Sequence, residues 1–267
     1  MQTYTHASLP QAAALLEKDK YTFSVLSRIL QGTCELIMTD HERLVICYSQ
    51  SPFPVWIWMP EDASEAEMER AWQILCAEFP YGEGFRYCAR SDFAQYVMRR
   101  AEAQGETLAV EKNLLAYHCP EPVPPGRRAE GCLCTASMDE LKLATAWEGE
   151  MRRECGAEIL PDDSIRAELT ELIEKKQLFI WKNGGCTAMC YVRINGNVAT
   201  FSCVYTRPQA RRRGYAASMI YEVSKALRRQ GLMPALYTDA DYAASNACYM
   251  QVGFQPKGSL CILVKRA

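Results

Sequence analysis

The sequence predicts a mixed α/β protein made of two domains that a proline-rich linker joins. Two observations predict this organisation. β-prone runs alternate with helical patterns on both sides of residues 119–126, CPEPVPPG, where four prolines fall within six residues. The chain of 267 residues is also long enough for two ordinary domains. Because proline fixes φ and donates no backbone hydrogen bond, we expect an extended linker over 119–130, an N-terminal α/β domain over 1–118 and a second domain over 131–267.

The composition is typical of a globular protein that does not bind nucleic acid. Apolar residues make up 49% of the chain and charged residues 23%, and the net charge is −2. A nucleic-acid-binding domain would usually carry a basic excess to neutralise phosphates. The N-terminus lacks a signal-peptide pattern, and no apolar run approaches the roughly 20 residues that span a bilayer. We therefore expect a cytoplasmic protein without nucleic-acid or membrane partners.

The 13 cysteines and three histidines do not form the pattern of a metal site. Cys132 and Cys134 make one C-x-C pair, without a second pair or a histidine nearby, whereas structural zinc sites use two such pairs. Other cysteines lie within apolar runs, where the thiol packs as a small hydrophobic group. We expect reduced structural thiols and no bound metal.

Before the linker, strand-like and helix-like stretches alternate. The expected strands, rich in β-branched, aromatic and aliphatic residues, are 34–39, 44–48, 55–59 and 108–117. The expected helices are 64–79 and 91–104. Ser64 with Glu67 three positions later is a capping box at the start of the first helix, and Gly105 ends the second. Residues 82–85, GEGF, are too weak a pattern for a phosphate loop, so this half shows no chemical motif.

After the linker, the elements follow the order strand, two helices and three antiparallel strands, then helix, strand, helix and strand. The first expected strand is 132–136, and the two helices are 138–155 and 164–176, the latter capped by Ser164. The next three strands are 178–181, 186–194 and 198–206. The turns between them, 182–185 and 195–197, are rich in asparagine and glycine, which favours hairpins.

The segment that carries chemistry follows the strand 198–206. It reads Arg207-Pro208-Gln209-Ala210, then Arg211-Arg212-Arg213-Gly214-Tyr215-Ala216, and opens a helix that Gly231 ends. The first amides of a helix have no internal partner and lie at the positive end of the helix dipole, which suits a phosphate. The small Gly214 and Ala216 allow close approach. Three arginines at this end oppose the dipole unless an anion is present, so we favour an anion site over a solvated charge run.

The pattern of this segment resembles the acetyl-CoA signature of the GNAT superfamily of N-acetyltransferases. The dinucleotide pattern G-x-G-x-x-G and the P-loop pattern are absent, and the loop instead reads R-x-x-G-x-A from Arg211 to Ala216. Downstream, residues 245–254 match S-N-x-x-Y-x-x-x-G-F, which many members share. The resemblance extends from residue 131 to the C-terminus. It implies a GNAT-like central mixed sheet flanked by helices in this half, with a second α/β domain before it.

The resemblance also implies acetyl-CoA as cosubstrate and a set of residues that hold it. In this family the strand before the loop separates from its neighbour, and the pantetheine arm pairs with the exposed backbone. The residues that correspond to the cofactor site are Val204, Tyr205, Thr206, Arg211, Arg212, Arg213, Gly214, Tyr215, Ala216 and Asn246. Asn246 is expected to cap the helix that contains it, to contact the cofactor, or both.

The implied reaction is direct transfer of an acetyl group to the amine of a small molecule or peptide, in a ternary complex. Tyr249 corresponds to the proton donor for the departing thiolate, although a packed aromatic residue is the alternative. Many members carry a glutamate on the strand before the loop as general base, yet residues 199–206 contain no carboxylate. Glu148 and Glu150 on the first helix are the nearest alternatives. Exposed helix charges are the simpler interpretation of both, so no base is assigned.

Two other classes of function stay open at this point. A non-catalytic acyl-CoA sensor would keep the arginine loop and lack turnover, and the missing base is its best support. An interaction protein without a ligand would leave the three arginines unexplained. The N-terminal half is compatible with a diverged GNAT-like domain, which would form a wall of the acceptor pocket or pack structurally. The acceptor amine and the oligomeric state are not readable from the sequence.

Overall fold

The chain divides into two compact units. The computed structural model describes residues 3–4, 9–32 and 34–266. The first unit contains the described residues up to Ala116, together with Thr238–Asp241 and the segment that begins at Lys257. The second contains Tyr117–Tyr237 and Tyr242–Pro256. The end of the chain therefore leaves the second half of the sequence and becomes part of the first unit.

A mixed sheet forms the centre of the second unit. Its strands, in spatial order, are β11 (Met233–Asp239), β10 (Val198–Thr206), β9 (Cys186–Asn195), β8 (Leu178–Lys182) and β7 (Cys132–Thr135). Neighbours from β10 to β7 are antiparallel, and β11 is parallel to β10. The helices of this unit are α5 (Leu141–Glu154), α6 (Asp162–Glu174), α7 (Tyr215–Arg229) and α8 (Ala243–Gln251). Short 3₁₀ turns, η4 (Met138–Glu140) and η5 (Pro208–Ala210), precede α5 and α7.

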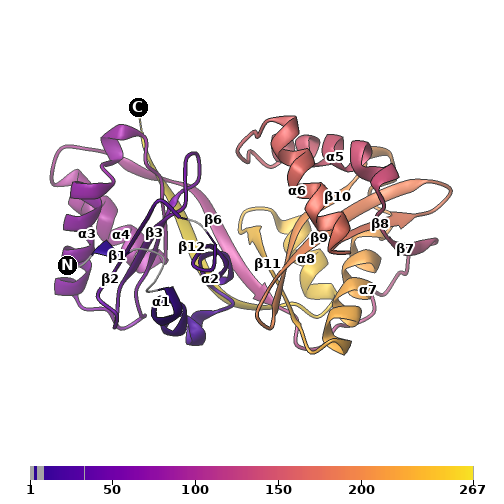
Figure 1. The fold of residues 1–267 in the computed structure, drawn as a ribbon, viewed down its shortest axis with the longest axis horizontal. Coiled ribbons are helices and arrows are strands. Elements are labelled where there is room, and N and C mark those ends of the chain that lie inside the picture. Colours follow the sequence, from indigo (N-terminus) through magenta and orange to yellow (C-terminus); the bar gives the residue numbers. More distant parts are fainter. Residues whose placement is uncertain (1–2, 5–8, 33, 267) are drawn as a thin grey trace. The chain divides into compact units, whose positions relative to one another are not determined.

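The helices of this unit cover both faces of its sheet. Helices α5 and α6 lie together on one face, where Trp147 and Leu169 pack against Met189 and Tyr191 of β9. Helices α7 and α8 lie on the other face (Figure 1). The apolar residues of α7 recur every three or four positions, and Met219, Ile220, Val223 and Leu227 are buried. This stripe fixes α7 on the sheet and so places its first turn directly after β10.

The first unit repeats the element order of the second. Its sheet has the strand order β1 (Thr3–Tyr4), β2 (Leu36–Thr39), β3 (Val45–Tyr48), β4 (Val55–Trp58), β5 (Tyr87–Ala89), β12 (Gln255–Lys265) and β6 (Leu108–His118). Its helices are α1 (Leu9–Leu15), α2 (Ser24–Ile29), α3 (Glu65–Glu78) and α4 (Ser91–Glu102), with 3₁₀ turns η2 (Glu17–Asp19) and η3 (Tyr81–Glu83). The strands β1 to β4 are antiparallel neighbours and β4 is parallel to β5. In this order β4 and α3 take the places that β10 and α7 take in the second unit.

The proline-rich linker is extended but held along its length by the second unit. The N–H of Val123 donates to the carbonyl of Val252 (3.0 Å), and the N–H of Ala129 donates to Ser218 Oγ on α7 (2.8 Å). Arg228 Nε donates to the carbonyl of Pro120 (3.0 Å). A Cβ atom at Gly253 would lie 2.3 Å from the carbonyl oxygen of Glu121, so only glycine fits beside the linker there. The linker thus braces α7 and α8 rather than hanging free.

The elements expected from the sequence agree with these bounds to within a few residues, apart from three points. Ser164 is not a helix cap, because α6 begins two residues earlier with Pro161 in the cap position. The helix expected over 138–155 starts as the 3₁₀ turn η4 before α5. The segment after Lys257, expected within a domain over 131–267, pairs through Cys261–Ala89 and Leu263–Tyr87 with β5 of the first unit. The domain division at the linker stays a prediction.

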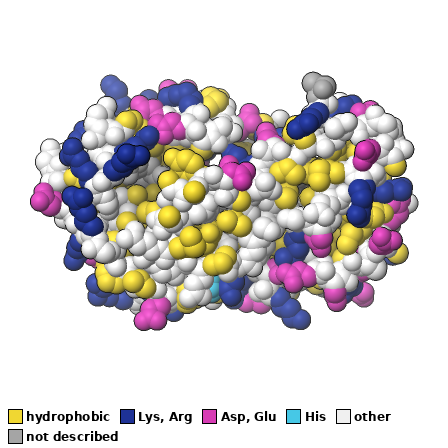
Figure 2. Space-filling model, turned by 180° about the vertical axis from the view of Figure 1, so that it is seen from behind, with side chains coloured by type: hydrophobic (Ala, Val, Ile, Leu, Met, Phe, Trp, Pro, Cys, Tyr) yellow, Lys and Arg dark blue, Asp and Glu magenta, His cyan; other side chains and the backbone are white. Residues whose placement is uncertain are grey.

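The surface carries charges of both signs, which nearly cancel in the net charge of −2. On the face shown in Figure 2, basic and acidic side chains are interspersed. Among the described residues, no helix combines the length and apolarity needed to traverse a bilayer. The same residues contain no cluster of three or more His, Cys, Asp or Glu side chains suited to a metal ion. The thirteen cysteines are free thiols.

Candidate active site

β10 separates from β11 halfway along its length. Parallel pairing joins the two strands from Val198–Met233 to Phe201–Leu236. On its other side β10 stays paired with β9 as far as Thr206, but the register shifts between Ser202 and Tyr205. Such a bulge bends a strand and increases its twist. As a result, residues 202–206 present a backbone edge that β11 does not cover.

The bulge is centred on a strained residue. Cys203 has a φ of +47°, in the left-handed region. A non-glycine residue in that region costs about 1–3 kcal/mol and persists only where its surroundings enforce it, often at ligand sites. Cys203 is buried, and its thiol packs in the apolar core beneath α5 and α6. This packing holds the bulge in place without any ligand.

The uncovered end of β10 leads into the first turn of α7. The first i→i−4 hydrogen bond of this helix runs from the N–H of Ser218 to the carbonyl of Gly214 (3.0 Å). The amides that precede Ser218 are therefore the open first amides of a 15-residue helix, whose cap residue, Gly214, has no side chain to satisfy them. Arg212 (φ +61°) and Gly214 (φ +81°) are both left-handed, and alternation of this kind gathers N–H groups into an anion-binding concavity.

Gly214 has a structural role in addition to any role in binding. A Cβ atom there would lie 3.0 Å from the carbonyl oxygen of Arg127 in the linker. Its left-handed φ is the second reason for glycine, because other residues are strained in that region. From the sequence, the only reason for a glycine at this position was the close approach of a phosphate. A substitution at Gly214 would disturb the contact with the linker as well.

The three arginines of the loop are placed differently. Arg211 bridges to α5, where its guanidinium contacts both carboxylate oxygens of Glu154 (2.7 and 2.8 Å), and its Nε donates to the carbonyl of Thr206 (2.9 Å). Arg212 and Arg213 are exposed, and within the described part of the chain neither forms an ion pair. Arg211 therefore fixes the loop against α5. Arg212 and Arg213 are the cations that stay available beside the open amides.

The corresponding helix start in the first unit has the opposite character. At the beginning of α3, Ser64 Oγ accepts from the N–H of Glu67 (3.4 Å), and the Glu67 carboxylate accepts from the N–H and Oγ of Ser64 (both 2.7 Å). The first turn also contains Glu65. Its own side chains thus satisfy this N-terminus and surround it with negative charge, which disfavours a phosphate. Of these two topologically equivalent positions, the second unit's is the one suited to an anion.

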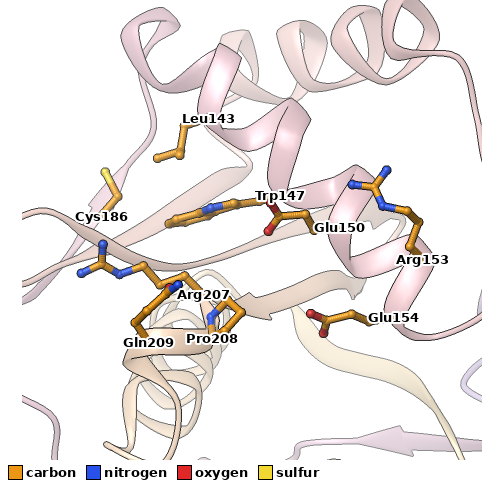
Figure 3. A pocket seen from close by; sticks show the side chains of 9 residues that line it. All are labelled: Leu143, Trp147, Glu150, Arg153, Glu154, Cys186, Arg207, Pro208 and Gln209. Atoms are coloured by element: carbon orange, nitrogen blue, oxygen red, sulfur yellow. The ribbon is translucent and has the colours of Figure 1, made fainter.

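A pocket of about 600 Å³ lies beside the loop, on the α5 face of the sheet. It is lined by Leu143, Trp147, Glu150, Arg153, Glu154, Cys186, Arg207, Pro208 and Gln209. Figure 3 shows the ring of Trp147 in its centre, with the Glu150 carboxylate near one end of the ring and the guanidinium of Arg207 toward the other. The pocket thus combines an aromatic floor with charges of both signs.

Tyr205 connects this pocket with the separated end of β10. Its ring packs against Trp147 (5.6 Å between ring centres), and its hydroxyl donates to Glu150 Oε2 (2.5 Å). Burial raises the pKa of Tyr205 to about 12, and the hydrogen bond and charge of Glu150 contribute to the rise. Tyr205 is therefore a protonated donor at neutral pH that orients the Glu150 carboxylate. This places a carboxylate next to β10 although the strand itself carries none.

Glu148 is not the exposed helix charge that the simpler interpretation of the sequence predicted. Its side chain is completely buried, and its Oε1 accepts from Arg152 (2.8 and 3.0 Å) and from the Tyr191 hydroxyl (3.1 Å). Among the residues that the structure describes, its Oε2 has no hydrogen-bond partner. The negative charge of Glu148 adds to the rise in the pKa of the Cys203 thiol, which burial already causes. The expectation of a solvent-facing side chain was therefore wrong for Glu148, whose carboxylate lies near the bulge.

Tyr249 lies on α8 within an aromatic cluster. Its side chain is buried and its ring packs on Phe254, which packs in turn on Phe201 of β10 (6.0 Å between ring centres in each pair). Burial raises the pKa of its hydroxyl, the Cys248, Cys190 and Cys203 thiols add smaller contributions, and a hydrogen bond with Ser245 opposes the rise. Tyr249 is therefore a neutral phenol near the bulge. The packing that was the alternative interpretation is present, and it is compatible with a proton donor.

Asn246 does not cap α8, because the helix starts three residues earlier. Its side chain is buried, with Nδ2 donating to the carbonyl of Tyr242 (3.1 Å) and Oδ1 accepting from the Tyr117 hydroxyl (3.3 Å). The expected capping role is wrong. These bonds fix the start of α8 instead.

Comparisons with known proteins find a matching family model and solved structures similar to the whole chain. Residues 180–261 match the model of the family described as FR47-like protein. A GNAT-family acetyltransferase from Colwellia psychrerythraea shares 14% identity at a TM-score of 0.63, over 100% of this chain and 99% of that one. A GCN5-related N-acetyltransferase from Sphaerobacter thermophilus shares 13% identity at a TM-score of 0.69, over 99% and 94%. No curated protein matches the sequence at a significant level.

The chain has the GNAT fold. The fold that the resemblance to the GNAT superfamily implied is thereby confirmed. A third similar structure, a GCN5-related N-acetyltransferase from Kribbella flavida, shares 15% identity at a TM-score of 0.63, over 94% of this chain and 95% of that one. In each case the similarity extends over both halves of the chain. The repeated element order is therefore part of the shared fold.

Within this GNAT fold, the sequence did not identify the pocket residues Trp147, Glu150 and Arg207 as a group. The sequence does contain a pattern that could have identified the pocket residues on α5. Leu143, Trp147, Glu150 and Glu154 are spaced by four, three and four positions, which places them on one face of α5. An apolar stripe that turns acidic along a helix beside the arginine loop would have predicted a polar pocket there. Arg207 was named only as the end of the strand.

Proposed function

We propose that this chain binds acetyl-CoA in its second unit and transfers the acetyl group to an amine. The observation that carries the proposal is the separation of β10 from β11 after Phe201–Leu236, directly before an uncapped helix start. Two arginines beside this helix start form no ion pair with any described residue. A pantetheine arm is an amide-containing chain that can pair with the free edge of residues 202–206. The pyrophosphate would then lie at the open amides of α7, beside Arg212 and Arg213.

The reaction would need no covalent intermediate on the protein. The amine nitrogen attacks the thioester carbonyl carbon, the C–S bond breaks, and CoA leaves as a thiolate. A backbone N–H near the bulge would stabilise the developing oxyanion, and Tyr249 would protonate the thiolate. Glu150 would accept the proton that the attacking amine loses. Holding both reactants against the rigid bulge would supply much of the acceleration.

A non-catalytic acyl-CoA sensor is the second candidate. The observation that favours it is that the separated strand carries no carboxylate to serve as base. Glu150 weakens this argument, because its carboxylate is held by Tyr205 on that strand. The two functions share the same cofactor site and differ in turnover.

Two measurements test the proposal. Acetyl-CoA at millimolar concentration should raise the melting temperature, because a ligand that binds only the folded state stabilises it by mass action. Incubation with acetyl-CoA and a panel of primary amines should release free CoA in an amine-dependent manner. Stabilisation without any release would favour the sensor. No stabilisation by acetyl-CoA or CoA would contradict both functions.

A further inference from the structure

The pocket beside α5 has a distribution of charge that restricts what it can accept. This inference rests on the proposed function and concerns its acceptor. Two acidic residues, Glu150 and Glu154, and two basic residues, Arg153 and Arg207, line the pocket. Their formal charges cancel, but their partners differ. The availability of each charge therefore decides the class of ligand.

One of the two carboxylates is already neutralised. Glu154 accepts two hydrogen bonds from Arg211, so it is paired within the protein. Glu150 accepts a hydrogen bond only from the neutral Tyr205 among the described residues, and its charge is uncompensated. The pocket therefore offers one carboxylate to a cation. A polyamine, which would need several, is disfavoured.

The two guanidinium groups also differ. Arg153 is folded back along α5, and a Cβ at Gly149 would lie 3.5 Å from its Nη1. In Figure 3 its guanidinium lies along α5, on the far side of the Glu150 carboxylate from the ring of Trp147. Arg207 lies on the opposite side of that ring from Glu150, and within the described residues no carboxylate forms an ion pair with it. Arg207 is therefore the cation that the pocket offers to an anion.

We propose that the acceptor is a zwitterion, an amino acid or short peptide-like molecule that carries a carboxylate together with its amine. Its ammonium group would lie at Glu150, its carboxylate at Arg207, and its apolar carbons on Trp147 and Leu143. Arginine binds carboxylates through two parallel hydrogen bonds, so its guanidinium recognises a carboxylate more specifically than a point charge such as the lysine ammonium does. Arg207 directly follows the separated strand, so the same contact would set the amine next to the bulge.

The test compares amines that differ only in the carboxylate. L-Leucine would be measured against L-leucinamide and 3-methylbutylamine, and L-phenylalanine against phenethylamine, by release of free CoA from acetyl-CoA. We expect kcat/KM to be about ten- to a hundredfold higher for the amino acids, the range for a hydrogen bond between charged groups. Arg207→Gln should remove that preference by raising KM for the amino acids. It should leave the amines without a carboxylate nearly unchanged.

Arg153→Gln is the matched control, because it removes the other arginine that lines the same pocket. It should keep the preference. Equal rates for amines with and without a carboxylate, or a preference that survives Arg207→Gln, would overturn the proposal.

Calorimetric titration with the amino acid alone separates this inference from the proposed function. Binding that Arg207→Gln abolishes, without any acetyl transfer, would keep the zwitterion site and reject the transferase. Neither binding nor transfer would reject both.

Discussion

At the scale of single residues, the pair Tyr205–Glu150 joins the two parts of the candidate active site. Tyr205 belongs to the separated end of β10, and Glu150 belongs to the pocket. Their hydrogen bond explains how this chain lacks a carboxylate on β10 and still has one beside that strand. The sequence could not show this link, because the two residues are 55 positions apart and no local pattern connects them.

Glu150→Gln tests whether this carboxylate is the base. General base catalysis contributes about 10²–10⁴-fold, so kcat should fall by that range while the affinity for CoA stays the same. Tyr205→Phe is the informative partner variant, because it keeps the carboxylate and removes only the group that orients it. Its loss should be smaller than that of Glu150→Gln. Equal losses in the two variants would mean that Glu150 acts only by holding Tyr205.

Tyr249→Phe tests the proton donor. The substitution keeps the ring that packs on Phe254 and removes the hydroxyl near the bulge. We expect kcat to decrease by about 10²–10⁴-fold with little change in melting temperature or CoA affinity. Steady-state kinetics and thermal melts on the same preparation give both quantities. If kcat is unchanged, Tyr249 has only the packing role.

At the scale of elements, the decisive contrast is between the starts of α3 and α7. They hold equivalent places in the two units, yet α3 is capped by Ser64 and Glu67 and α7 begins at Gly214 among arginines. This much was readable from the sequence, because caps and charges near helix ends are local patterns. The bulge at Cys203 was not readable, because a left-handed residue within a β-prone run leaves no local pattern.

The contrast between the two helix starts predicts which arginines contribute to the affinity for CoA. Arg212→Ala combined with Arg213→Ala should weaken CoA binding about tenfold at low salt and less at high salt, because exposed charges are screened while the backbone amides remain. Arg229→Ala is the matched control. It removes one positive charge from the other end of α7, roughly 22 Å away along a 15-residue helix. The affinity for CoA would be measured by calorimetric titration at two salt concentrations. An equal change of affinity in the double variant and in Arg229→Ala would contradict the site.

Two capping boxes also predict how stability depends on pH. The pKa of Glu67 is lowered from 4.5 to about 2 by its bonds to Ser64 and by Arg43, and that of Glu140 is lowered to about 2 by Lys182 and Ser137. A lowered pKa means that the ionised form is stabilised by folding. This contribution is complete above about pH 4.5 and is lost as the pH falls towards 2.

Urea midpoints measured between pH 7 and pH 2.5 would test this dependence. The wild-type midpoint should fall steeply below pH 4.5, and the decrease should be shallower in the double variant Glu67→Gln, Glu140→Gln. Glu78→Gln, at the far end of α3, is the control and should keep the wild-type slope. Parallel curves for the wild type and the double variant would show that other carboxylates dominate the acid response.

At the scale of the whole molecule, the sequence predicted two halves but not how the end of the chain is used. Strand patterns identify a strand by its own residues, and the partner of an isolated strand depends on which sheet edge is open. β12 lies between β5 and β6 in the first unit, where Leu263 and Cys261 belong to the core around Trp72. The first 116 residues therefore do not contain a complete core.

This arrangement predicts the effect of removing the end of the chain. A chain that ends at Pro256 loses Cys261 and Leu263 from the first unit's core and uncovers the edge of β5. Burial of each large apolar side chain is worth about 1.5–3 kcal/mol, a large share of the 5–15 kcal/mol that stabilises an ordinary domain. We expect the first unit to unfold or aggregate through the exposed edge, while the site residues of the second unit are all retained.

Thermal melts and limited proteolysis of this shortened chain, with and without CoA, would separate the two units. Fragments from the first 116 residues should disappear early, whereas CoA should still protect the region from Tyr117 to Pro256 if that unit folds without β12. The control is Lys265→Ala, which removes only the charge that pairs with Glu106 near the end of β12 and should melt like the full chain. A shortened chain with the stability of the full one would mean that the two units are independent domains divided at the linker, as the sequence alone suggests.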